Sequence, residues 1–284
     1  MEYCHECWNT KGELYFRLDE IDLKKINLFR CCYLEPYKSI DVSDINNIDI
    51  KELFNESLSL SPILQEPIKD RCFSCNNLSQ KLEKISISLS RACNLNCYHC
   101  FFNEHKDTPE MKNAYFSLLE KTKGLSLEEL KLTDIGEPFF YFIDTFNFLK
   151  KLSFKKDTKK IIFITNLTLL NINRIKLLKK ISDITHIQYE FNVSIDGITK
   201  ETYENTRIGG NFDVVMQNLK DLVEVFGVEN IKPSFTIKEP NILDTKNVIS
   251  FFKETFGLEV DIGADVYDEF CGLIKPIAYN YKNF

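Results

Sequence analysis

The stretch that decides the fold reads KISISLSRACNLNCYHCF and spans residues 84–101. Its first half alternates isoleucine with serine, which is typical of a β-strand with one apolar face. Its second half places Cys93, Cys97 and Cys100 on one short loop with C-x3-C-x2-C spacing. Three thiolates on such a loop can bind three irons of a [4Fe–4S] cube and leave the fourth iron without a protein ligand. The spacing therefore indicates an iron–sulfur site directly after a strand.

A zinc knuckle is the alternative interpretation of these three thiols. Tetrahedral zinc needs four protein ligands, and His99 or His105 could supply the fourth. The spacing of the cysteines does not by itself decide between zinc and a cluster.

The composition is that of a folded, acidic protein. The chain has 284 residues, is 44% hydrophobic and 27% charged, and carries a formal net charge of −6. This balance argues against general nucleic-acid binding. No apolar run approaches the roughly 20 residues of a membrane span, and the first residues lack the pattern of a signal peptide. We therefore expect a cytoplasmic protein with no nucleic-acid and no membrane partner.

The cysteine pattern outside the loop indicates a second site. In a reducing compartment, close cysteine pairs are typical of metal or cluster ligation rather than of disulfides. Residues 1–80 hold six cysteines and the single tryptophan, without a clean alternation of helices and strands. We predict a small cysteine-rich region at 1–80, followed by the main domain at 81–284. The C-x2-C pairs are Cys4/Cys7, Cys72/Cys75 and Cys97/Cys100.

The main domain alternates strand patterns with helix patterns. Predicted strands cover 84–90, 130–135, 160–165, 187–195, 231–237 and 258–262. Predicted helices cover 110–123, 139–152, 171–181, 212–226 and 243–256, and a short helix is expected at 48–58. Six repeats within about 200 residues favour an α/β fold, a partial (βα)6 TIM-like barrel, over the eight-stranded form. Such barrels carry their chemistry at the carboxyl ends of the strands, which is where the cysteine loop falls.

Four ordered motifs resemble the radical S-adenosylmethionine (radical SAM) superfamily. The cysteine loop, with the ring of His99 before its last cysteine, is similar to the family's cluster loop. DIGEP at 134–138 resembles the Gly-Gly-Glu-Pro motif, ITNLTLL at 164–170 resembles Thr-Asn-Gly-x-Leu, and 193–213 resembles the fourth strand and helix of the peptide-modifying branch. The likeness covers about residues 85–265.

Two positions depart from the family pattern. Ile135 and Leu167 stand where the family prefers glycine. A side chain at either position would narrow the cofactor pocket if it pointed into that pocket. Neither departure affects a residue of ligand type.

The resemblance implies a site for S-adenosylmethionine. Gly136 and Glu137 would meet the amino group of the methionine moiety, and Ser194 with Arg207 would hold its carboxylate. Asn166 is expected to contact the ribose or the methionine. The implied cofactor-binding residues are Gly136, Glu137, Asn166, Ser194, Arg207 and His99.

Each motif also has a purely structural interpretation. Glu137 could serve as an acid in the first turn of a helix. Asp196 is expected to shape the turn into Gly197. Arg207 taken alone would be a surface charge.

The first 80 residues resemble an auxiliary-cluster region of SPASM or twitch type. The resemblance implies a second [4Fe–4S] cluster, with structural zinc as the alternative. Cys7 and Cys31 are possible substitutes among its ligands. The implied ligands are Cys4, Cys32, Cys72 and Cys75.

The resemblance also implies a reaction. One electron from the cluster would split S-adenosylmethionine into methionine and a 5′-deoxyadenosyl radical, which abstracts hydrogen from a substrate. The expected substrate is a peptide or protein side chain, as for a maturase or oxidoreductase, and a sugar or small metabolite is the alternative. A non-catalytic iron–sulfur scaffold protein is the hypothesis from another class. The expected partner, besides the substrate, is an electron donor such as flavodoxin or ferredoxin.

Overall fold

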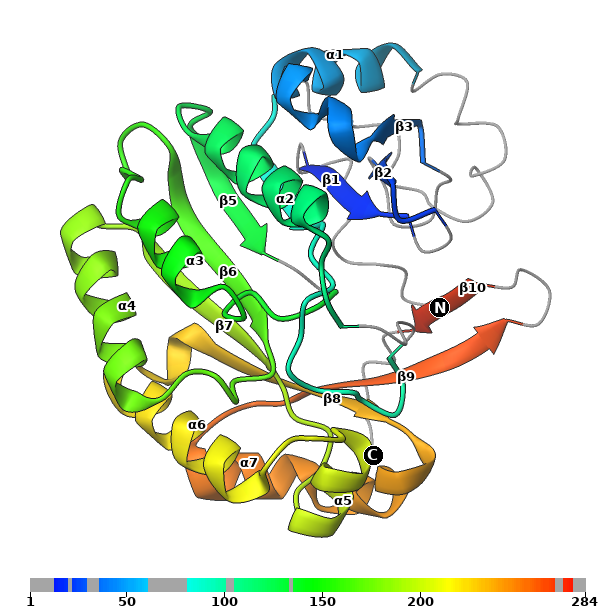
Figure 1. The fold of residues 1–284 in the computed structure, drawn as a ribbon. Helices are drawn as coiled ribbons and strands as arrows, with labels where there is room; N and C mark the ends of the chain where they lie inside the picture. The colour runs from blue at the N-terminus through cyan, green and yellow to red at the C-terminus, as the bar shows by residue number, and fades with distance from the viewer. Residues whose placement is uncertain are drawn as a thin grey trace.

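The structure is a computed structural model that describes residues 13–19, 22–29, 36–60, 81–100, 105–132, 135–268 and 273–277. The described strands form one ten-stranded sheet in the order β10-β9-β8-β7-β6-β5-β4-β1-β2-β3. The sheet is strongly curved, and most of the described helices lie along its outer side (Figure 1).

Six neighbouring parallel strands form the centre of this sheet. Their number and their order in the chain confirm the predicted partial (βα)6 barrel. The prediction for β8 matches residue by residue, whereas β5 begins three residues earlier than predicted and β9 three residues later. In chain order the strands are β4 (Lys84–Ser88), β5 (Leu127–Leu132), β6 (Thr158–Thr165), β7 (Gln188–Ser194), β8 (Ile231–Ile237) and β9 (Asp261–Asp268).

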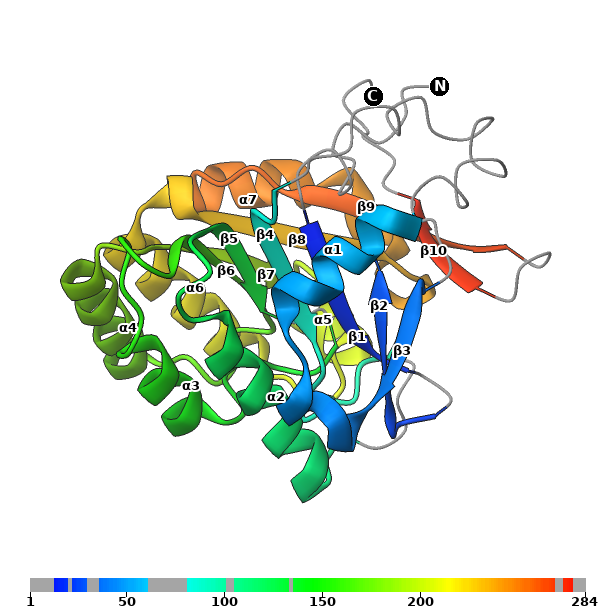
Figure 2. The ribbon, with the colours of Figure 1, turned by 90° about the horizontal axis from the view of Figure 1, so that it is seen from above.

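Helices connect these strands and cover the outer face of the barrel (Figures 1 and 2). Five of the connecting helices agree with predicted ones to within a few residues. A sixth, α5 (Lys200–Thr206), was not predicted, because only Tyr203 and Thr206 of this polar helix are buried. The predicted five are α2 (Pro109–Thr122), α3 (Phe142–Leu149), α4 (Ile172–Thr185), α6 (Phe212–Phe226) and α7 (Val248–Phe256).

The two faces of the barrel strands differ in polarity. In β4, Ile85 and Ile87 are fully buried in the apolar core beneath the helices. Ser86 and Ser88 point to the opposite, inner face. The same alternation in β5 and β7 puts Glu129, Lys131 and Glu190 on the inner face. The concave side of the sheet is therefore largely polar, with Ile162 of β6 as an apolar member beside Lys131 and Glu190, while its convex side is the hydrophobic core.

The described part of residues 1–80 extends the same sheet. β1 (Glu13–Leu18) pairs with β4 in parallel, and β2 (Lys25–Phe29) and β3 (Lys38–Asp41) follow as antiparallel strands. The sequence shows no clean alternation of helices and strands in this region, yet its strands join the common sheet, because Leu14, Phe16 and Leu18 bury their side chains in the common core.

A short 3-10 helix, η2 (Val42–Asn47), and helix α1 (Ile50–Leu60) complete this N-terminal part. α1 lies close to the predicted helix at 48–58. The predicted boundary near residue 80 and all six cysteines of the region lie outside the described residues. The division into 1–80 and 81–284 stays a prediction.

At the other edge, β10 (Leu273–Ile277) pairs with β9 in antiparallel orientation. Short 3-10 helices, η3 (Val228–Asn230) and η4 (Glu239–Lys246), flank β8. Among the described residues, no helix has the length and hydropathy required to cross a bilayer.

Candidate active site

The predicted site residues gather at the carboxyl ends of four neighbouring strands. The cysteine loop follows β4, Glu137 follows β5, Asn166 follows β6, and Ser194 is the last residue of β7. This placement agrees with the rule that parallel barrels carry their chemistry at that end.

The cysteine loop is fixed by backbone hydrogen bonds to the chain just after α5. The amide of Asn96 donates to the carbonyl of Ile208 at 2.8 Å, and the amide of Tyr98 donates to the carbonyl of Thr206, also at 2.8 Å. Within the loop, Cys100 donates to the carbonyl of Cys97 at 2.9 Å. Arg207 lies between the two accepting residues, so the loop and Arg207 are held together.

The cysteine sulfurs receive N–H donors. The Leu95 amide lies 3.4 Å from the sulfur of Cys93, and Nδ2 of Asn166 lies 3.5 Å from it. Nη1 of Arg207 donates to the sulfur of Cys97 at 3.5 Å. Such donors stabilise thiolate charge. Burial raises the pKa of the Cys93 thiol to about 11, and the N–H donor from Leu95 opposes this shift.

The three thiols of the loop are available as ligands. Cys93, Cys97 and Cys100 are all free of disulfides. Within the described part of the chain, no three His, Cys, Asp or Glu side chains converge on one metal ion. In a [4Fe–4S] cube each of the three cysteines would bind its own iron, and the choice between a cluster and zinc stays a prediction.

The two histidines considered as zinc ligands have other neighbours. Nε2 of His105 lies 3.1 Å from Oδ1 of Asn96. Nε2 of His99 lies 3.7 Å from Oδ2 of Asp196. The ring of His99 therefore sits beside the buried Asp196, close to the predicted cofactor-binding residues.

Gly136 occupies a position that excludes a side chain. Its φ is +78°, and a Cβ there would clash with the carbonyl oxygens of Ser90 and Ala92. The next amide, of Glu137, donates to the Ala92 carbonyl at 2.9 Å. The segment after β5 thus packs directly on the start of the cysteine loop.

The carboxylate of Glu137 joins the ends of β5 and β6. It is buried and accepts from the Thr165 hydroxyl at 2.8 Å, the Asn166 amide at 2.7 Å and the Phe139 amide at 3.1 Å. Burial raises the pKa of Glu137 to about 7, although these three donors oppose the shift. The expected contact of Glu137 with a methionine amino group stays a prediction.

Asn166 donates hydrogen bonds to the cysteine loop. Besides the sulfur of Cys93, its Nδ2 donates to Oδ1 of Asn94 at 3.2 Å. Its Oδ1 accepts from the hydroxyl of Thr168 at 2.6 Å. The side chain therefore orients the first cysteine, and its expected contact with the cofactor stays a prediction.

Arg207 forms a buried ion pair that the sequence did not indicate. Nη2 of Arg207 lies 2.6 Å from Oδ2 of Asp196, and Asp196 is fully buried. Burial alone would lower the pKa of Arg207, but Asp196 raises it above the ordinary value. The other oxygen of Asp196 accepts from the Thr236 amide at 2.6 Å. Asp196 thus does more than shape a turn, since it holds the guanidinium that contacts Cys97.

Two polar groups beside this pair have no partner. Nε of Arg207 is buried without an acceptor among the described residues. Ser194 is half-buried at the end of β7, and its hydroxyl forms no hydrogen bond within the described part of the chain. An orphaned donor and a free hydroxyl fit an incoming carboxylate, as the resemblance implied.

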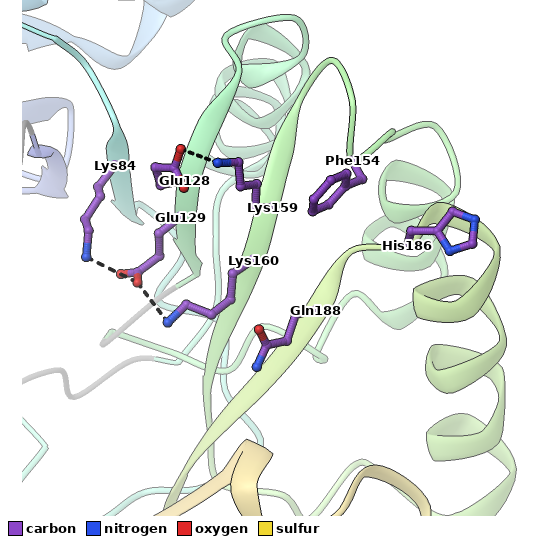
Figure 3. A pocket seen from close by; sticks show the side chains of 8 residues that line it. All are labelled: Lys84, Glu128, Glu129, Phe154, Lys159, Lys160, His186 and Gln188. Carbon is purple, nitrogen blue, oxygen red and sulfur yellow. Dashed lines mark hydrogen bonds and ion pairs between the residues drawn. The ribbon is translucent and has the colours of Figure 1, made fainter.

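A cavity of about 470 Å³ lies at the opposite end of the barrel, at the amino ends of β4 to β7 (Figure 3). Its charged groups pair with one another. Glu129 lies between Lys84 and Lys160, and Lys159 pairs with Glu128 at 2.6 Å. This cavity is therefore distinct from the cluster of predicted site residues.

Comparison with protein families gives one match over more than half of the chain. The family model described as Radical SAM superfamily matches residues 87–237. This range contains the cysteine loop and the motifs at 134–138, 164–170 and 193–213.

The chain is also similar in sequence to curated proteins. A "Probable GTP 3′,8-cyclase" of Saccharolobus islandicus (strain Y.N.15.51 / Yellowstone #2) is 26% identical over 170 residues, which is 58% of this chain and 51% of that protein. The chain thus spans about half the length of the curated relatives it matches.

Two solved structures are similar in fold. The crystal structure of Streptococcus suis SuiB bound to S-adenosylmethionine has a TM-score of 0.50 at 17% identity, over 92% of this chain and 64% of that one. Native anSMEcpe with bound AdoMet has a TM-score of 0.48 at 19% identity, over 66% of this chain and 53% of that one.

Proposed function

This chain belongs to the radical SAM superfamily, and we propose that it reductively cleaves S-adenosylmethionine to start hydrogen abstraction from a substrate. Cys93, Cys97 and Cys100 would hold the [4Fe–4S] cluster. When bound, this cluster supplies the electron that breaks the sulfonium C–S bond and releases the 5′-deoxyadenosyl radical. The observation that carries the proposal is the cysteine loop, whose sulfurs accept N–H donors from Asn166 and Arg207.

The residues around the loop would bind and orient S-adenosylmethionine. The orphaned Nε of Arg207 and the free hydroxyl of Ser194 support a site for its carboxylate. Asp196 fixes the guanidinium and partly neutralises it. Gly136 and Glu137, packed against the start of the cysteine loop, support a site for the amino group.

For the substrate we propose a peptide or protein side chain, modified by a maturase or oxidoreductase of the SPASM or twitch-like branch. The motifs at 193–213 support this proposal through their likeness to the peptide-modifying branch. A small metabolite is the second candidate, and one observation favours it: the curated relatives bear the name of a nucleotide cyclase.

We also propose a second [4Fe–4S] cluster, or zinc, on Cys4, Cys32, Cys72 and Cys75, with Cys7 and Cys31 as substitutes. All these cysteines lie outside the described residues, and the support is their pairing in the sequence. An external donor such as flavodoxin or ferredoxin would supply the electron.

The test is anaerobic purification, followed by metal analysis and incubation with dithionite and S-adenosylmethionine. We expect iron on the protein and formation of 5′-deoxyadenosine, and loss of the latter in Cys97→Ala. Cys271→Ala removes a thiol outside both proposed ligand sets and serves as the matched control. An iron-loaded wild-type protein that yields no 5′-deoxyadenosine would refute the proposal.

A further inference from the structure

The inner face of the barrel presents its side chains in rows that follow the strand register. Lys84, Glu129 and Lys160 are neighbours on β4, β5 and β6 and form the row at the amino ends. Lys131, beside Ser86 on β4, belongs to the next row. These rows lead from the cavity in Figure 3 toward the cysteine loop.

Ion pairs within and between the rows neutralise the charges near the amino ends of the strands. Glu129 lies 3.4 Å from Lys84 and 3.1 Å from Lys160. Glu190, which by register belongs to the row of Lys131, lies 3.4 Å from Lys160 and 3.0 Å from Lys232. Burial alone would raise the pKa of Glu129, but Lys84 and Lys160 hold it below the ordinary value. The amino-terminal end of the inner face is therefore a closed ladder of alternating charges.

Lys131 differs from these lysines. It is half-buried on the inner face, and no carboxylate oxygen of a described residue lies within 4.0 Å of its Nζ. Glu13 lies on β1, on the other side of β4 from Lys131; the charge of Lys131 acts on it, but its carboxylate accepts a hydrogen bond from Ser86. Lys131 thus brings to this concave surface a positive charge that no direct ion pair within the described residues neutralises, although it acts at longer range on Glu13 and Glu129.

Two further groups on this face lack partners. Ser88 is fully buried, and its hydroxyl has no hydrogen-bond partner among the described residues. Oδ1 of Asn192 on β7 is likewise buried and unpaired within the described part of the chain. An unpaired buried polar atom costs roughly 1–3 kcal/mol, so two such atoms on the same inner face, one on β4 and one on β7, point to a missing partner.

These groups lie between the charge ladder and the cysteine loop. At about 3.3 Å per residue, Lys131 stands about 7 Å beyond Glu129 along β5. Gly136 and Glu137 follow at the carboxyl end of the same strand. A molecule in contact with Lys131 would therefore have its far end near the site at which the proposed radical forms.

We propose that the inner face binds the substrate, with Lys131 receiving an anionic group and Ser88 and Asn192 pairing with neutral polar groups. This inference rests on the proposed function. The anionic group that Lys131 receives is a carboxylate or a phosphate. A carboxylate would come from an acidic peptide and a phosphate from a nucleotide, so the charge requirement holds for both substrate candidates.

The test titrates two anions, pyrophosphate and glutarate, into the iron-loaded protein by calorimetry, with S-adenosylmethionine present and no reductant. One of them should bind with a dissociation constant in the millimolar range, and Lys131→Met should weaken it about ten-fold or more. Lys131→Arg should retain binding. Lys159→Met is the matched control, because Lys159 lies on the adjacent strand and already pairs with Glu128.

A preference for pyrophosphate assigns the site to a phosphate group, and a preference for glutarate assigns it to a carboxylate. If Lys131→Met folds poorly, Ser88→Ala takes its place. This variant removes one unpaired hydroxyl, adds no volume, and should weaken the same binding. If neither anion binds, or if both variants bind like the wild type, the proposal is wrong. Failure of the proposed function would appear separately, as absent 5′-deoxyadenosine, because the titration requires no turnover.

Discussion

At the scale of single residues, the buried pair of Asp196 and Arg207 controls the surroundings of the cysteine loop. Asp196→Asn keeps an acceptor for the Thr236 amide but leaves the guanidinium without its counter-charge. Removing one partner of a buried pair is strongly destabilising, so we expect a loss of about 3 kcal/mol in unfolding free energy. Urea denaturation measures this loss.

The matched control for that variant is Asp183→Asn, which breaks the pair of Lys179 and Asp183 on the exposed side of α4. An exposed pair of this kind contributes about 0.5 kcal/mol or less. If the two variants had equal stability, Asp196 would not be the residue that stabilises Arg207.

Because the pKa of Glu137 is raised, the stability of the folded protein depends on pH, and the direction of the shift gives the sign of this dependence. Burial, its largest cause, moves this pKa from 4.5 to about 7. Between these values the folded state keeps a proton that the unfolded state releases, so stability falls as pH rises from about 4.5 to about 7. The decline amounts to about 3 kcal/mol at most.

Urea midpoints at pH 5 and pH 8, without S-adenosylmethionine, measure this decline. Glu137→Gln carries no charge at either pH and should remove it. The exposed Glu201→Gln should behave like the wild type. A wild-type protein that is more stable at pH 8 than at pH 5, with Glu137→Gln unchanged, would contradict the assignment.

At the scale of elements, Gly136 sets how closely the end of β5 approaches the cysteine loop. Gly136→Ala combines a strained φ with a clash against the Ser90 carbonyl. Gly124→Ala is the matched control, since Gly124 has a similar φ of +80° but no atom within 4 Å of an added Cβ. Strain alone costs about 1–2 kcal/mol, so Gly124→Ala should fold and retain iron. Gly136→Ala should lose iron, as measured by metal analysis, and equal iron in both would refute the packing argument.

Local sequence patterns account for most of the barrel. Ile85 and Ile87 alternate with serines, and the resulting strand lies where the pattern predicts it. The same signal was present in β1, where Leu14, Phe16 and Leu18 alternate with Glu13, Tyr15 and Arg17, but the cysteines around it drew the interpretation toward an irregular region. Helix α5 carries too few apolar residues for a helical period.

The pairing of Asp196 with Arg207 could not be found from a pattern. Both residues belong to motifs that were recognised, yet eleven positions of turn and helix separate them. Their contact depends on how α5 returns to the cysteine loop through the hydrogen bonds at Thr206 and Ile208. Likewise, the charge ladder on the inner face requires the strand register, which the sequence does not provide.

At the scale of the whole molecule, the ion pairs of the inner face and the predicted cofactor-binding residues lie at opposite ends of the barrel. Ion pairs line its amino-terminal end, while the cysteine loop and Arg207 occupy the carboxyl ends of the strands. The largely polar inner face connects the two. A lumen of this kind suits a polar ligand, because the apolar surface of the strands is already covered by the helices.

The metal content of the whole chain tests the two-centre organisation. Two [4Fe–4S] clusters correspond to about eight irons per chain, and one corresponds to about four. Replacing Cys93, Cys97 and Cys100 together by alanine should leave about four irons if the cysteines at 1–80 hold an auxiliary cluster. Replacing Cys72 and Cys75 should remove that remainder and leave the first cluster, with 5′-deoxyadenosine formation intact. Zinc in the triple variant, measured by mass spectrometry, would assign a structural metal to the N-terminal cysteines. A triple variant without any metal would contradict a second centre and leave the cysteine loop as the one centre of the chain.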